Sequence, residues 1–174
     1  MKRPLQGILF SIYATMAMAI LPEPAMENIE DAKVFYNRGT AHYEKGEYDA
    51  AIKDLSIAAI LEPGAPDVYY NRGLSYRRQH KNDEAISDFS KAIELYPGQA
   101  SYHSERCNAR IAKSDLTGAI LDCSEALRLS PGEASDHLMR GVAYMLRGDL
   151  DEALVDSIQA LQIQPDHPDA RRLL

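Results

Sequence analysis

The sequence predicts an all-α chain in which antiparallel helix pairs stack into a solenoid, and three observations carry this prediction. Residue types recur at a step of 34 positions in four registers without an insertion. Each register contains two stretches with the apolar spacing of a helix, separated by turn residues. No stretch has the alternating pattern of a β-strand. The recurring positions are Gly39, Gly73, Cys107 and Gly141; Ala51, Ala85, Ala119 and Ala153; Ala58, Ala92, Ala126 and Ala160; and Pro63, Pro97, Pro131 and Pro165.

Each repeat is expected to form two helices joined by a short turn such as Lys45-Gly46-Glu47. The recurring proline ends the second helix, because proline has no N–H to donate in a helix interior. One helix pair cannot bury its apolar side alone, so the pairs are expected to share a continuous core. The helices are expected near residues 33–45, 48–61, 67–79, 82–96, 100–112, 116–129, 134–146 and 150–163.

The recurring residues resemble those of the tetratricopeptide repeat (TPR) family over residues 32–165. Repeat two carries the pattern most fully, with Tyr69, Gly73, Tyr76, Ala85, Phe89, Ala92 and Pro97. Repeat three departs furthest, with His103, Cys107, Arg110 and Cys123 where an aromatic residue, Gly, Tyr and Phe are usual. The resemblance implies a right-handed superhelix with repeats at 32–65, 66–99, 100–133 and 134–167 and a short cap segment at 168–174.

The N-terminal residues have the pattern of a secretory signal peptide. A basic start, Met1-Lys2-Arg3, precedes the uncharged apolar run from Leu5 to Leu21, and Ala17-Met18-Ala19 offers small residues for cleavage. We therefore expect a signal peptide at 1–19, an irregular linker at 20–31, and a periplasmic or secreted protein. The alternative is an uncleaved segment that anchors the protein in the membrane, because the run approaches the length of a bilayer span.

Composition and motifs exclude several functions. The formal charge of the chain is −7, and no lysine or arginine stripe is present, so a nucleic-acid partner is not expected. The sequence contains no glycine-rich phosphate loop, nucleophile elbow or His-Glu-x-x-His helix. We accordingly predict a protein that is not an enzyme and requires no cofactor.

An arginine and an aspartate recur in every repeat, 16 residues apart, and form a predicted ladder of ion pairs. Antiparallel packing of the two helices brings these positions to nearly the same height. A structural ladder is favoured over an anion-binding role, because a paired arginine already has its charge satisfied. The pairs are Arg38 and Asp54, Arg72 and Asp88, Arg106 and Asp122, and Arg140 and Asp156.

Cys107 and Cys123 occupy two positions that face the seam between the helices of repeat three. In an exported protein such a pair is a candidate disulfide, and two small buried thiols are the alternative that the sequence leaves open. A zinc site completed by His103 and His137 matches no short zinc motif, so no metal site is predicted.

In TPR proteins the first helix of each pair lines the concave surface, and the resemblance therefore implies a groove that binds a peptide or protein. Proteins of the family that grip the C-terminal carboxylate of chaperones use lysine, asparagine and arginine at set positions. Here Asn71 alone fits, whereas Tyr36, Thr40, Ser101 and Glu105 fill other positions, so that clamp is not expected. The predicted groove residues are Tyr36, Asn37, Thr40, Tyr43, Tyr70, Asn71, Arg77 and Arg78.

The fourth repeat supports a second hypothesis, a structural subunit of a cell-envelope complex that assembles through its ends. The segment after Pro168 is short for a cap helix, so apolar residues of repeat four are available for a homodimer. The alternative is that they pack internally and under the short cap. These residues are Leu138, Val142, Met145, Leu146, Ile158 and Leu161.

Overall fold

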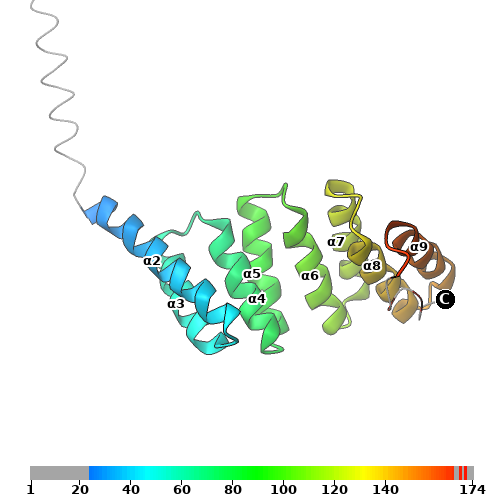
Figure 1. Cartoon of the computed structure of the whole chain (residues 1–174), viewed down its shortest axis with the longest axis horizontal. Helices are drawn as coiled ribbons and strands as arrows, with labels where there is room; N and C mark the ends of the chain where they lie inside the picture. Colours follow the sequence, from blue (N-terminus) through cyan, green and yellow to red (C-terminus); the bar gives the residue numbers. More distant parts are fainter. Residues whose placement is uncertain (1–23, 167–168, 170, 172–174) are drawn as a thin grey trace, which may run out of the picture.

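The computed structural model describes residues 24–166, 169 and 171, and within them eight α-helices follow one another without a β-strand. Figure 1 shows the helices as pairs in an elongated row, which confirms the predicted all-α solenoid. The predicted signal peptide, and most of the predicted cap segment, lie outside the described residues. The helices are α2 (Pro24–Glu44), α3 (Tyr48–Leu61), α4 (Pro66–Arg78), α5 (Asn82–Leu95), α6 (Ala100–Ala112), α7 (Leu116–Leu129), α8 (Ala134–Arg147) and α9 (Leu150–Ile163).

Each helix packs mainly against its neighbours in the chain. The pairs are α2 with α3, α4 with α5, α6 with α7 and α8 with α9, and each second helix also contacts the first helix of the next pair. The first helices contact one another from pair to pair, α2 with α4, α4 with α6, and α6 with α8. The first helices therefore form one continuous surface along the row.

The turn inside each repeat places one residue at positive φ, at positions 34 residues apart: Gly46 at 79°, His80 at 60°, Ser114 at 62° and Gly148 at 98°. In each turn the next amide donates to the carbonyl five residues earlier, as Glu47 N–H does to His42, and this bond caps the first helix. Glycine adopts this conformation freely, whereas a side chain there costs roughly 1–2 kcal/mol. Repeats two and three thus keep the turn geometry without its preferred residue.

The seam inside each pair is filled by a small residue of the first helix facing a side chain of the second. A Cβ added at Gly73 would lie 2.7 Å from the Phe89 ring, and one added at Gly39 would lie 2.7 Å from Leu55. Repeat three uses a different solution, because Cys107 and Cys123 are joined by a disulfide across the same seam. Both cysteines are fully buried.

The arginine and the aspartate of each repeat form a two-pronged ion pair. Arg72 donates from Nε and Nη2 to the two carboxylate oxygens of Asp88, at 2.8 and 2.7 Å. The same two bonds join Arg38 to Asp54, Arg106 to Asp122, and Arg140 to Asp156. Each bond pair ties the first helix of a repeat to the second, as charge-assisted bonds of this geometry do best.

Three of these arginines also reach back to the preceding repeat. Their Nη1 atoms donate to a serine of the previous second helix: Arg72 to Ser56 at 3.2 Å, Arg106 to Ser90 at 3.0 Å, and Arg140 to Ser124 at 3.1 Å. The fourth position of this serine series is Ile158, which cannot accept such a bond. The ladder therefore sets the geometry between repeats as well as within them.

The N-terminal boundary of the first repeat differs from the prediction. Helix α2 begins at Pro24, so the expected linker at 20–31 is helical from residue 24 onward. Proline is well tolerated in the first turn of a helix, and neither proline nor glycine follows it before Gly39 to stop the helix. None of the described helices is both long and apolar enough to span a membrane.

Candidate protein-binding surface

The structure places the eight predicted groove residues on two neighbouring first helices. Tyr36, Asn37, Thr40 and Tyr43 lie on α2, and Tyr70, Asn71, Arg77 and Arg78 lie on α4. Asn37 and Arg78 are exposed and the other six are partly exposed. Because α2 contacts α4 directly, the two sets border one surface.

Hydrogen bonds between repeats hold several of these side chains in place. Asn71 Nδ2 donates to the Tyr36 hydroxyl at 2.9 Å, and Arg78 Nε donates to the Tyr43 hydroxyl at 3.2 Å. The Arg78 guanidinium also lies 6.0 Å from the centre of the Tyr43 ring. The hydrogen bond raises the pKa of Arg78. Contacts within the protein therefore hold these side chains in place before any partner binds.

The charge of Arg77 is matched inside the protein. Its Nε lies 2.8 Å from Glu105 Oε2, so the ion pair joins α4 to α6 across the surface. Arg77 is therefore not a free cation that could pair with an acidic group of a partner. Arg78 is the more exposed of the two arginines.

Tyr102 is a structural residue of this surface that the sequence did not indicate. Its hydroxyl donates to Asp67 Oδ1 at 2.6 Å, and its ring lies 5.0 Å from that of Tyr70. Burial and the Asp67 bond raise the pKa of Tyr102. Burial also raises the pKa of Tyr70, with a smaller contribution from Glu105. The spacing of 35 residues between Asp67 and Tyr102 is the only sequence signal of this contact.

Two pockets continue the surface beyond α4. One, of about 400 Å³, is bordered by Tyr48, Arg77, Arg78, His80 and Asn108 among others. The second, of about 430 Å³, lies between α6 and α8 and is lined mostly by polar side chains. Asn108 borders both pockets, so they are neighbours along the groove.

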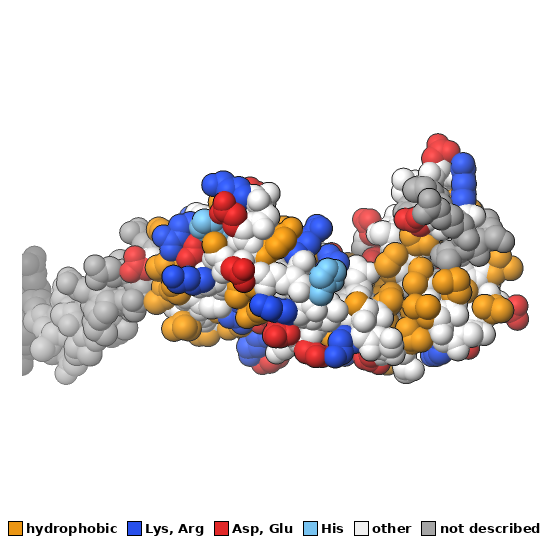
Figure 2. Space-filling model, turned by 90° about the horizontal axis from the view of Figure 1, so that it is seen from below, with side chains coloured by type: hydrophobic (Ala, Val, Ile, Leu, Met, Phe, Trp, Pro, Cys, Tyr) orange, Lys and Arg blue, Asp and Glu red, His pale blue; other side chains and the backbone are white. Residues whose placement is uncertain are grey.

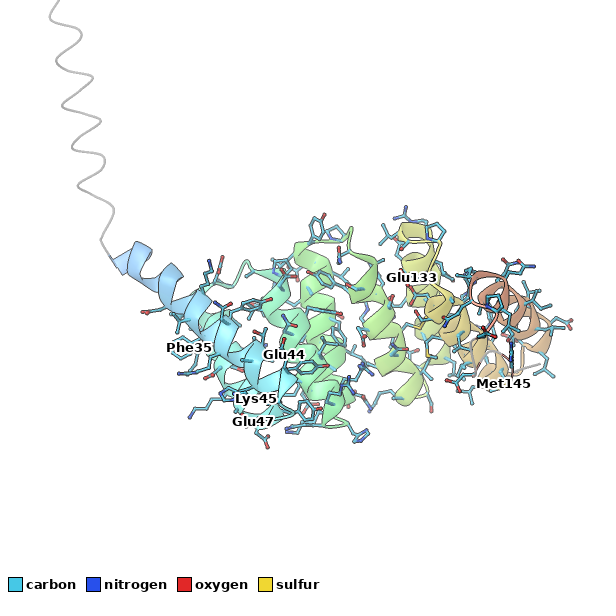
Figure 3. The ribbon with its side chains drawn as sticks, in the orientation of Figure 1. Phe35, Glu44, Lys45, Glu47, Glu133 and Met145 are labelled. Atoms are coloured by element: carbon cyan, nitrogen blue, oxygen red, sulfur yellow. A yellow bond between two sulfur atoms is a disulfide. The ribbon has the colours of Figure 1, made fainter. Side chains whose placement is uncertain are left out.

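The apolar side chains of repeat four divide between the core and the surface. Leu138 is buried in the seam with Ala160, so it is not part of an exposed end as one hypothesis required. Val142 and Leu161 are partly exposed, whereas Met145, Leu146 and Ile158 are exposed, and so are Leu150, Leu154 and Val155. Figure 2 shows hydrophobic side chains gathered over this end of the molecule, and Figure 3 labels Met145 there.

The two cysteines of repeat three are bonded to each other and are therefore not available as metal ligands. The disulfide uses both sulfur atoms that the alternative zinc site would need. Asp122 beside it is buried, yet His103, whose Nδ1 lies 3.8 Å from its carboxylate, and the two hydrogen bonds from Arg106 hold its pKa below the usual range. Among the residues that the structure describes, no group of three or more histidine, cysteine or acidic side chains is arranged to hold a metal ion.

Solved structures with this architecture were found at low sequence identity. The crystal structure of MamA protein superposes with a TM-score of 0.79 at 20% identity, covering 83% of this chain and 79% of MamA. The first TPR of Spaghetti (RPAP3), bound to the HSP90 peptide SRMEEVD, has a TM-score of 0.61 at 26% identity and covers 62% of this chain and 85% of that one. The second TPR domain of human RPAP3, in complex with the HSP70 peptide SGPTIEEVD, has a TM-score of 0.60 at 24% identity and covers 63% and 95%.

A search of functionally described proteins gives no significant sequence match. The tetratricopeptide repeat model matches residues 36–100, 75–134 and 105–171, which together make up well over half of the sequence. These matched segments contain the paired helices, the seam glycines and the arginine–aspartate ladder described above. The chain belongs to the tetratricopeptide repeat family.

Proposed function

We propose that this protein is a non-catalytic interaction scaffold that binds a peptide or protein on the surface formed by its first helices. The carrying observation is that aromatic and amide side chains of α2 and α4 are partly exposed and already fixed by hydrogen bonds between repeats. A surface whose side chains are ordered before binding loses little conformational entropy when a partner arrives. Tyrosine and arginine are also among the residues that most often dominate the binding energy of protein interfaces.

The peptide complexes of RPAP3 support peptide binding by this fold. The residues of this chain, however, favour a ligand of a different kind. The RPAP3 peptides end in Glu-Glu-Val-Asp, and they are therefore acidic. On α6 of this chain, Ser101 and Glu105 stand where a carboxylate-gripping TPR protein uses lysine and arginine. We therefore propose a partner other than an acidic chaperone tail.

Export from the cytoplasm is part of the same proposal. The N-terminal sequence pattern supports it, and so does the disulfide, because such bonds form and persist in oxidising compartments. A periplasmic or secreted scaffold would meet partners in the cell envelope or outside the cell. If the N-terminal segment stays uncleaved, the scaffold acts at a membrane surface.

Photocrosslinking in the native cell tests the groove. We expect a photoreactive residue at Asn37, which is exposed on α2, to capture a specific partner, because it lies beside the ordered Tyr36. The matched control is the same residue at Lys53, which is exposed on the second helix α3. Capture of the same partner at both positions, or at Lys53 alone, would contradict binding in the groove. Mass spectrometry of the adduct identifies the partner.

A second candidate function, assembly through repeat four, is favoured by one observation. Ile158 stands where the earlier repeats have the serine that accepts a bond from the next arginine, so this face is apolar where the others are polar. Leu150 and Leu154 lie on the same face of α9 at helical spacing and are exposed. An apolar face of this kind suits self-association.

Sedimentation of the full chain tests this second candidate. We expect the wild type to show a concentration-dependent dimer, and Leu150→Lys with Leu154→Lys to remain monomeric, because two buried charges would oppose the contact. The control is Ile60→Lys, which changes an exposed apolar residue on α3 at the other end of the row. A monomeric wild type at high concentration rules out the dimer.

A further inference from the structure

The pocket between α6 and α8 is a concavity of the groove that is lined mostly by polar side chains. It has a volume of about 430 Å³, and its walls include Ser101, Ser104, Glu105, Asn108, Asp136 and Met139. Figure 3 labels Glu133, which borders it at the start of α8. The walls therefore come mainly from two successive first helices, α6 and α8, and the pocket lies between repeats three and four.

The side chains that line this pocket carry negative charge without matching positive charge in the lining. The described residues that line it include the carboxylates of Glu105, Glu133 and Asp136 and no lysine or arginine. Glu105 is matched by Arg77 from the neighbouring helix, at 2.8 Å. The lining itself supplies no cation for Glu133, which is exposed, or for Asp136, which is buried. A buried carboxylate without a cation is costly, and a positively charged ligand group would remove that cost.

Hydrogen-bond acceptors in the pocket outnumber the donors that serve them. Ser104 lies against Asp136, but its single hydroxyl proton is also directed at the Ala100 carbonyl, 3.1 Å away. Burial raises the pKa of Asp136, as expected for a carboxyl with too few donors. Asn108 Oδ1 is buried and accepts no hydrogen bond from any residue that the structure describes. The pocket thus lacks donors at two separate places.

We propose that this pocket receives a lysine or arginine side chain of the partner, a step that rests on the groove function proposed above. Ammonium and guanidinium groups carry only hydrogen-bond donors, and their positive charge would match the carboxylates of Asp136 and Glu133, for which the lining supplies no cation. The methylene stem of such a side chain packs on Met139, and the pocket volume accommodates its length. The preferred ligand is then opposite in sign to the acidic peptides bound by RPAP3.

Binding of defined peptide pools to the full chain tests this inference. The probes are fluorescein-labelled nonapeptides with blocked ends, one fixed central residue (Lys, Arg, Leu or Glu) and uncharged mixed residues elsewhere. We expect the Lys and Arg pools to bind roughly tenfold more tightly than the Leu pool, and the Glu pool more weakly still. Asp136→Asn is expected to remove this preference, because it keeps the shape of the side chain and deletes the charge.

Two further variants keep the test decisive. Glu133→Gln changes an exposed residue that is not expected to affect folding, and it should reduce the Lys and Arg preference in part. Glu94→Gln on α5 removes one unit of charge away from the pocket and should leave the preference unchanged. Equal binding of all pools, an unchanged preference in Asp136→Asn, or binding of no pool overturns the cationic pocket. The groove function is judged separately, by crosslinking at Asn37.

Discussion

Replacing Arg72 by leucine alone should lower the free energy of unfolding by roughly 3–5 kcal/mol, and adding Asp88→Leu to the same chain should restore most of it. The single change leaves Asp88, which is buried, without the two guanidinium bonds that compensate its charge. The double change replaces both charges by apolar side chains of similar size. Urea unfolding of the wild type, the two single variants and the double variant measures the coupling energy.

The pH dependence of the single variant provides a second readout. Burial already raises the pKa of Asp88 even though Arg72 is beside it, and loss of Arg72 should raise the pKa further. A carboxyl whose folded-state pKa is raised costs stability as pH rises above its unfolded value of about 3.9. The free energy of unfolding of the Arg72→Leu variant should therefore be closest to that of the wild type near that pH. The difference between the two proteins should grow towards neutral pH.

A control cycle shows whether the coupling is specific. Arg72→Leu combined with Glu125→Ala changes a carboxylate of another repeat, one that pairs with Arg128 at the surface. The two losses in this control should add, because the residues share no partner. If the losses of Arg72→Leu and Asp88→Leu also add, the ladder does not work as an ion pair.

Reducing the disulfide should lower the free energy of unfolding by about 3 kcal/mol, the value expected for a closed loop of roughly 15 residues. Cys107 and Cys123 are separated by 16 positions and lie in the seam that joins α6 to α7. Repeats one and two fill this seam with Leu55 and Phe89 against glycine. Repeat three has no large side chain there and depends on the covalent link.

Urea unfolding with and without dithiothreitol measures this effect. The double variant Cys107→Ala and Cys123→Ala is the control, because it should unfold at the same urea concentration under both conditions and at a lower one than the oxidised wild type. Two free thiols in the unreduced native protein, or an unfolding midpoint that dithiothreitol does not change in the wild type, would contradict the bond. Either result would also weaken the proposal of export.

The repeating positions allowed the sequence alone to predict the fold. A step of 34 residues, a small residue in each first helix and a proline after each second helix define helix pairs that must stack, because no pair has a core of its own. Most helix boundaries were predicted to within one residue for the same reason. The start of α2 was not, because Pro24 reads as a linker residue or as a helix start, and local sequence does not distinguish these roles.

The tertiary structure decided which side chains of the groove are already paired within the protein and which can contact a partner. The positions of Arg77 and Glu105 are readable from the sequence, but only the approach of α4 to α6 brings them into an ion pair and removes Arg77 as a free cation. The same approach joins Tyr102 to Asp67, and the approach of α6 to α8 creates the polar pocket beside Asp136. The sequence determined the repeats and their ladder, because these depend on fixed spacing within about 34 residues. The character of the groove depends on contacts between repeats, where the residues differ and only their positions in space decide which charges remain unmatched.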